Sequence, residues 1–211
     1  MTTETLKSVY PETLGWVEKK LDTKEMEYLW RIINKQKESA KQHLAGQINQ
    51  SNYLVDKSGW FFTNTLTPLI SYYEEHHGTR TRKHFLSHKH PLFLAKMWVN
   101  YQRENEFQPL HDHYGVYSFV VWMKIPFDFE KQNTNPVSST SNNKCISAFE
   151  FYFLNMLGER DSYRYGLNAV DEGTLLFFPS ELAHCVYPFY NCKEERISIS
   201  GNIGFNTAKQ L

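Results

Sequence analysis

Two histidines separated by one residue are the first feature of this sequence that could do chemistry. His111 and His113 stand directly before an apolar run. Alternate residues of a β-strand point to the same face of a sheet, so both imidazoles could reach one metal ion. The spacing alone is weak evidence, because His88 and His90 share it without any companion pattern. The pair therefore becomes a candidate metal site only together with further ligands.

A third histidine follows an interrupted strand. The short apolar run from Thr174 to Phe178 begins after Gly173, Pro179 breaks it, and His184 comes five residues later. A strand, a turn and a returning segment can bring His184 back to the first pair. Three ligands on one face of an iron ion leave three positions for substrates and oxygen. The sequence therefore predicts a metal site made by these three histidines.

An arginine and a serine at alternate positions are suited to binding a carboxylate. Arg196 and Ser198 share one face of a predicted strand; the guanidinium can form a bidentate pair and the hydroxyl adds a donor. Arg196 lies twelve residues after His184, so the two strands could run side by side. An arginine that points into an apolar barrel would need an anion. The alternative is an exposed ion pair with Glu194 or Glu195.

The elements that must position these residues are helices in the first half of the chain and short strands in the second. Aromatic residues make up 16% of the chain, which favours strands. Short strands with little room for crossovers predict a mainly β fold, a jelly-roll barrel with N-terminal helices packed on one side. We predict a single domain over residues 1–211, with a helical part at 1–92 and a β-barrel catalytic core at 93–205.

The individual elements follow from hydrophobic periodicity and from turn residues. Pro68 is expected to kink the second helix or to reset its start. The predicted helices are 23–45 and 58–77, the predicted strands are 96–102, 116–125, 148–155, 174–178 and 196–203, and a polar surface loop or lid is predicted at 127–143.

Residues on the strands next to the histidines are candidates for lining a pocket. Tyr117 and Ser118 lie beside the histidine pair and are candidates for contact with a substrate. Asn100 is a candidate for contact with a cofactor. Asn100 and Gln102 share the strand face opposite Tyr101, and the sequence leaves open which of these faces lines the pocket.

Composition and charge exclude several classes of protein. The chain has 23 basic and 23 acidic residues, so no basic field favours nucleic acid as a partner. The first residues lack the pattern of a signal peptide, and no apolar run is long enough to cross a membrane. Three cysteines without metal-type or redox-type spacing indicate reduced thiols. We therefore expect a cytoplasmic protein with a small-molecule or peptide substrate. The sequence gives no oligomeric state.

The order of these motifs resembles the 2-oxoglutarate/Fe(II)-dependent oxygenases. The pattern is His-x-(Asp or His), then Gly-x5-Pro-x4-His, then Arg-x-Ser. The closest resemblance is to small prolyl-hydroxylase-like proteins of marine bacteriophages and bacteria, and it covers roughly residues 96–204. The segments that carry it are WVNYQRENEFQPLHDH, VYSFVVWMKIP, GTLLFFPSELAHCVYPFYN and ERISISGN.

The resemblance implies a fold, a reaction and a set of roles. The fold is a double-stranded β-helix, and the cofactors are Fe(II), the co-substrate 2-oxoglutarate and O2. The reaction couples decarboxylation of 2-oxoglutarate to hydroxylation of a substrate, with prolyl residues of a protein as the guess by analogy and a free amino acid or other small molecule as the alternative. His111 and His184 match iron ligands, Arg196 matches the partner of the remote carboxylate, and Ser198 matches its helper. A phage-encoded member would act in the cytoplasm of its host.

One departure concerns the second metal ligand. Most of the superfamily has a carboxylate at the position of His113, and a carboxylate partly neutralises Fe(II) whereas imidazole does not. Three alternatives are open. His113 is a third nitrogen ligand, or Asp112 binds after a local bulge re-aims its side chain, or neither residue binds and water fills the position. We favour His113, because the residue next to His111 on a regular strand points away from the ion.

Two other functions also fit parts of the pattern. Gly-x5-Pro followed by a histidine resembles the second cupin motif, and some cupin dioxygenases bind iron through three histidines; these would not need Arg196. A jelly roll can also be a non-enzymatic structural or binding protein.

Overall fold

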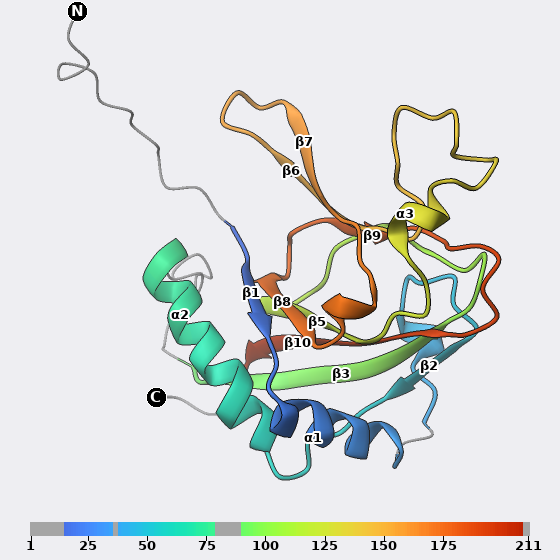
Figure 1. The fold of residues 1–211 in the computed structure, drawn as a ribbon. Coiled ribbons are helices and arrows are strands. Elements are labelled where there is room, and N and C mark those ends of the chain that lie inside the picture. The colour runs from blue at the N-terminus through green and yellow to red at the C-terminus, as the bar shows by residue number, and fades with distance from the viewer. Residues whose placement is uncertain (1–14, 36–37, 79–89, 209–211) are drawn as a thin grey trace, which may run out of the picture.

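Ten strands form two antiparallel sheets in the computed structural model, which describes residues 15–35, 38–78 and 90–208. One sheet has six strands in the order β1-β8-β5-β10-β3-β2, and the other has four in the order β4-β9-β6-β7 (Figure 1). The strands are β1 Val17–Lys20, β2 Gln50–Tyr53, β3 Leu92–Gln102, β4 Gln108–His111, β5 Tyr117–Lys124, β6 Phe149–Leu154, β7 Arg160–Tyr165, β8 Thr174–Pro179, β9 His184–Val186 and β10 Arg196–Phe205.

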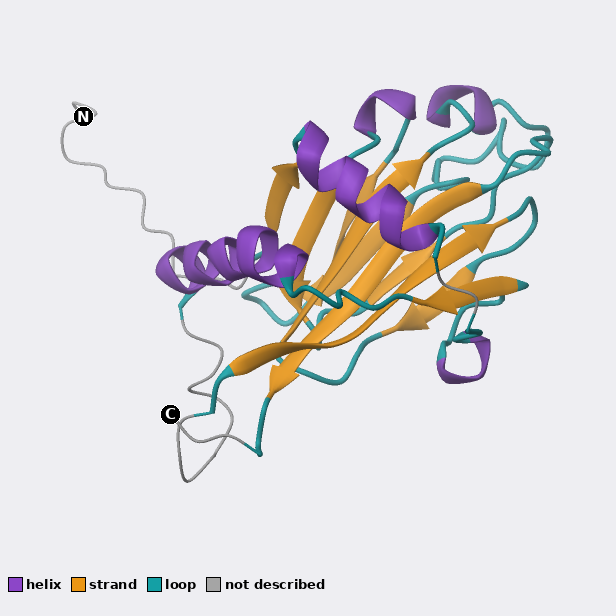
Figure 2. Cartoon of the chain, turned by 90° about the horizontal axis from the view of Figure 1, so that it is seen from below, coloured by secondary structure: helices purple, strands orange, loops and turns teal. Residues whose placement is uncertain are grey.

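Two helices cover the outer face of the six-stranded sheet (Figure 2). Helix α1, Thr23–Ile33, begins at a capping box in which Asp22 and Glu25 each accept from the other's backbone amide. Helix α2, Thr67–His77, follows a π-helical turn, Phe62–Leu66. Short helical segments lie at Lys41–His43, Phe129–Gln132 and Ala169–Asp171. Among the described residues, no helix combines the length and the apolar character that a bilayer crossing requires.

Two hydrophobic cores result from this layering. The first lies between the helices and the outer face of the six-stranded sheet and includes Leu29, Tyr73 and Val99. The second lies between the sheets and includes Trp122 and Phe151. The strands β5 and β8 therefore have both faces buried, which explains their nearly continuous apolar sequences.

The helical prediction for the N-terminal part is wrong in two respects. The first helix ends at Ile33 instead of residue 45, because the apolar stripe that contacts the core ends there. This part also supplies both edge strands of the larger sheet: β1 pairs with β8, and β2 pairs with β3. Both are polar and only four residues long, so they lack a readable alternation. Pro68 lies in the first turn of α2, and the helical segment that begins at residue 60 passes through the π-helical turn directly before it.

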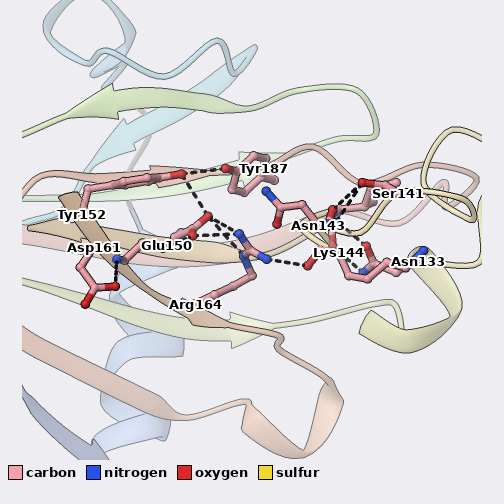
Figure 3. Close-up of polar contacts among 11 residues, drawn as sticks. Asn133, Ser141, Asn143, Lys144, Glu150, Tyr152, Asp161, Arg164 and Tyr187 are labelled. Atoms are coloured by element: carbon pink, nitrogen blue, oxygen red, sulfur yellow. Dashed lines mark hydrogen bonds and ion pairs between the residues drawn. The ribbon is translucent and has the colours of Figure 1, made fainter. Parts of the chain in front are cut away.

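A partly buried ion pair connects the edge of the smaller sheet to the loop before β6 (Figure 3). Arg164 of β7 donates to both oxygens of Glu150 at 2.9 and 3.0 Å and to the carbonyl of Lys144 at 3.0 Å. Ser162 and Tyr152 donate to the same carboxylate at 2.7 and 3.1 Å. Burial raises the pKa of Glu150, but the hydrogen bonds from Ser162 and Arg164 outweigh it, so the pKa is lowered on balance. The carboxylate is therefore ionised, and both of its oxygens accept hydrogen bonds.

We expect Glu150→Gln to lower the free energy of unfolding by about 1.5–3 kcal/mol, the usual value of hydrogen bonds to a charged group. Urea unfolding measures this. The matched control is Glu194→Gln, because Glu194 pairs with Lys124 at 2.7 Å on the surface, where ion pairs contribute little. An equal loss in both variants would contradict the role of Glu150.

Candidate metal centre and adjoining pockets

The three predicted histidines converge at one end of the barrel. His111 ends β4 and is the register partner of His184, which begins β9. His113 lies two residues beyond β4, where its amide donates to the carbonyl of Ser180 at 2.8 Å. The ring centroids are 4.4 to 5.1 Å apart, and one ring nitrogen from each histidine lies within 4.8 Å of the others. This arrangement could hold a single metal ion.

Backbone carbonyls orient two of the imidazoles. His111 Nδ1 lies 2.7 Å from the carbonyl of Pro109, and His184 Nδ1 lies 2.9 Å from that of Leu182. A carbonyl only accepts, so each Nδ1 carries the proton and each Nε2 keeps its lone pair. This second contact is typical of metal-binding histidines, since it fixes both the tautomer and the ring orientation.

The surroundings keep the imidazoles neutral. Burial, and then the neighbouring imidazoles, lower the pKa of His184 to about 3. Burial and His111 lower the pKa of His113 to about 4, and burial also lowers the pKa of His111. Neutral imidazoles with free lone pairs are the form that binds a metal ion.

The geometry favours His113 over Asp112 as the third donor. Asp112 is exposed and does not belong to the histidine cluster. Within the described ranges the candidate donor set is thus three neutral imidazoles, a set that suits iron among other transition metals.

An inner cavity of about 20 Å³ connects two of the histidines with the predicted carboxylate site. His113, His184, Arg196 and Ser198 all line it. Arg196 is only 2% exposed, and burial lowers its pKa to about 9, so the guanidinium is still charged at neutral pH. In the part of the chain that the structure describes, no carboxylate forms an ion pair with Arg196.

The alternative of a surface ion pair for Arg196 is excluded. Glu194 pairs with Lys124, and Glu195 pairs with Arg103. The guanidinium instead donates to neutral oxygens inside the barrel. A buried charge with only neutral partners is costly, so the position is suited to an anionic ligand.

A larger pocket of about 490 Å³ lies on the outer side of the histidines. Asn100 lines this pocket, whereas Arg196 lines the inner cavity. The amide oxygen of Asn100 accepts from Ser51 at 2.7 Å, and its buried Nδ2 has no partner among the described residues. The pocket wall is strongly aromatic and includes Tyr53, Phe93, Trp98, Tyr114 and Phe205.

The two predicted substrate contacts differ in position. Tyr117 is placed on the wrong face by the prediction: its ring packs against Tyr73 and Phe177 in the core below the helices, and its hydroxyl bonds to Glu74 at 3.0 Å. Ser118 belongs to the opposite face of the strand and bonds to Ser180 and Asn202, both at 2.9 Å. Its hydroxyl therefore fixes Asn202, which lines the outer pocket.

Sequence reasoning missed the roles of Trp98 and Gln102. The ring of Trp98 packs edge-on against His113, with centroids 5.7 Å apart, and Gln102 bonds to Arg196. The signal was present, because Trp98, Asn100 and Gln102 alternate along β3. The sequence did not identify the inner face. His88, which shares the spacing of the histidine pair, lies outside the described residues.

The fold and the site together define a class of protein, a jelly roll with a candidate metal site at one end of the barrel. The chain belongs to the 2OG-Fe(II) oxygenases: the model of the family 2OG-FeII_Oxy_5, described as a 2OG-Fe(II) oxygenase family, matches residues 96–202, just over half of the chain. The protein therefore uses Fe(II), 2-oxoglutarate and O2, and it is an oxidoreductase that couples decarboxylation of 2-oxoglutarate to hydroxylation.

Solved structures confirm the double-stranded β-helix fold. A prolyl-4-hydroxylase from Pseudomonas putida is similar at 14% identity and a TM-score of 0.51, over 90% of this chain and 92% of that one. An oxidoreductase of the 2OG-Fe(II) oxygenase family from Burkholderia pseudomallei is similar at 13% identity and a TM-score of 0.53, over 90% of this chain and 84% of that one. The non-heme alpha ketoglutarate dependent carbocyclase SnoK from nogalamycin biosynthesis is similar at 9% identity and a TM-score of 0.52, over 97% of this chain and 86% of that one. No curated protein matches the sequence.

Proposed function

We propose that His111, His113 and His184 bind the iron and that Arg196 and Ser198 hold the far carboxylate of 2-oxoglutarate. The observation that carries this proposal is the buried guanidinium of Arg196, which shares a cavity with two of the histidines and has only neutral partners in the described chain. A dicarboxylate that reaches from the metal to Arg196 would supply the missing negative charge. A three-histidine cupin dioxygenase would not need this arginine.

The protein's own residues position the reactants and exclude water. When bound, the iron and 2-oxoglutarate supply the oxidising chemistry. The carbonyls of Pro109 and Leu182 accept from Nδ1 of His111 and His184, which leaves the Nε2 lone pair of each imidazole free to bind the iron. The aromatic side chains of Trp98, Trp122 and Phe178 line the inner cavity, which favours a dry site around the co-substrate.

We further propose that the substrate is a prolyl residue of a peptide that enters through the outer pocket. A volume of about 490 Å³ exceeds what one small side chain fills, so it can admit a short segment of chain. Aromatic walls are the surfaces on which proline-rich segments dock. The prolyl-4-hydroxylase activity of the similar Pseudomonas putida protein supports the same substrate class.

Succinate formation tests the substrate proposal. With Fe(II), 2-oxoglutarate and O2, a proline-rich peptide is expected to raise succinate production at least about tenfold over the rate without substrate, because a bound substrate couples the reaction. The matched control is the same peptide with each proline replaced by alanine. Equal stimulation by both peptides would contradict the prolyl assignment, and greater stimulation by free proline would indicate a small-molecule substrate.

A further inference from the structure

Gln102 occupies the edge of Arg196 that would otherwise grip a carboxylate. Both Nε and Nη2 of Arg196 donate to Gln102 Oε1, at 3.2 and 2.6 Å. These two nitrogens form one fork of the guanidinium, the geometry with which arginine binds carboxylates. The remaining bonds go to the carbonyls of Ser147 at 2.6 Å and Tyr187 at 3.2 Å. The amide oxygen of Gln102 thus lies where a carboxylate oxygen is expected.

The size of the inner cavity leads to the same conclusion. A volume of about 20 Å³ holds about one water molecule, not a five-carbon diacid. Gln102 lines this cavity at the Arg196 end and is itself only 3% exposed. Moving this one side chain away would both enlarge the cavity and release the fork of the guanidinium.

The second hydrogen bond of Gln102 shows what its movement would disturb. Its Nε2 donates to the carbonyl of Glu106 at 2.5 Å, in the turn between β3 and β4. The carboxylate of Glu106 accepts from the amides of Asn49 and Arg103 at 3.0 and 2.8 Å, so this turn is held by other contacts. Loss of the Gln102 bond would therefore leave the turn in place.

We propose that Gln102 is a displaceable partner of Arg196, which satisfies the guanidinium while the site is empty and leaves it when 2-oxoglutarate binds. This inference rests on the proposed function. A neutral amide can be exchanged for a carboxylate because charge-assisted hydrogen bonds are about twice as strong as neutral ones. The exchange lowers the apparent affinity for 2-oxoglutarate, since part of the binding free energy is used to displace Gln102.

Two substitutions should change the affinity in opposite directions. In Gln102→Ala the competing amide is gone, so 2-oxoglutarate should bind several-fold more tightly, while the ligand-free protein should melt at a lower temperature. In Gln102→Glu a permanent carboxylate pairs with Arg196, so 2-oxoglutarate should bind more than tenfold more weakly, without a lower melting temperature. Calorimetric titration of 2-oxoglutarate into the anaerobic Fe(II) protein measures affinity, and thermal unfolding checks folding.

The control and the contrary outcomes are distinct. Gln132 also bonds to backbone, through the amide and carbonyl of Tyr190 at 2.9 and 2.8 Å, but it does not contact Arg196, so Gln132→Ala should bind 2-oxoglutarate like the wild type. Weaker binding by Gln102→Ala, or unchanged binding by Gln102→Glu, would overturn the inference. A wild-type protein that binds no 2-oxoglutarate would instead overturn the proposed function, and the inference with it.

Discussion

Replacing Arg196 with methionine is expected to weaken the binding of 2-oxoglutarate about 30-fold or more while the metal stays bound. Loss of one partner from a buried charge pair costs about 2–5 kcal/mol, which corresponds to this range. Arg196 is the charged side chain in the inner cavity, and it lies on β10, outside the histidine cluster. Calorimetric titration of 2-oxoglutarate and metal analysis of the same sample measure the two effects separately.

Two further variants show whether the effect comes from the geometry of the guanidinium. Arg196→Lys keeps a charge but not the two-pronged fork, so its affinity should fall between wild type and Arg196→Met. Arg103→Met is the matched control, because Arg103 is exposed and pairs with Glu195 on the surface. Arg196→Met leaves the buried oxygens of Gln102, Ser147 and Tyr187 without a donor, which lowers the unfolding temperature, so thermal unfolding must show that each variant is folded at the temperature of the titration. Full affinity in Arg196→Met would exclude the carboxylate role.

Replacing His184 with alanine is expected to reduce the affinity for Fe(II) by more than about 100-fold, since even residues that only support a ligand contribute 10- to 100-fold. His184 is the most deeply buried of the three histidines, and its partner in the register is His111. Metal content after anaerobic loading with Fe(II) and desalting measures the loss. His76→Ala is the control, because His76 is an exposed histidine on α2 that stacks on Tyr72.

The same measurement decides between the two candidates for the second ligand. His113→Ala should lose the metal like His184→Ala, whereas Asp112→Ala should retain it, because the exposed Asp112 carboxylate does not belong to the cluster. Retention in His113→Ala together with loss in Asp112→Ala would assign the carboxylate as the ligand and would show that the loop after β4 rearranges around the ion.

The sequence predicted the strands whose composition is distinctive and missed those that only pairing defines. The apolar runs of β5 and β8 and the alternation of β10 led to correct elements. Strand β7, with the sequence RDSYRY, and the three-residue β9 have no such signature. They exist because they pair with β6, and such long-range pairing cannot be read from local periodicity.

The candidate site was predicted to a similar extent, and for a related reason. The spacing of His111 and His113 and the motif order were sufficient to bring the histidines together. The sequence did not show on which face of β5 the side chain of Tyr117 lies, because both faces are apolar and buried, one against the helices and one between the sheets. The same ambiguity on β3 hid Gln102, whose amide contacts the arginine that the sequence did identify.

The strand order also has a consequence for the biosynthesis of this protein. The last strand in chain order, β10, lies between β5 and β3 in the middle of the larger sheet, and it carries Arg196. During translation, β3 and β5 therefore lack their common pairing partner, β10, until it leaves the ribosome after both of them. Their apolar side chains stay available to chaperones or to aggregation during that interval. Because Arg196 lies on β10, the pairing of this strand completes the sheet and places the guanidinium inside the barrel in the same step.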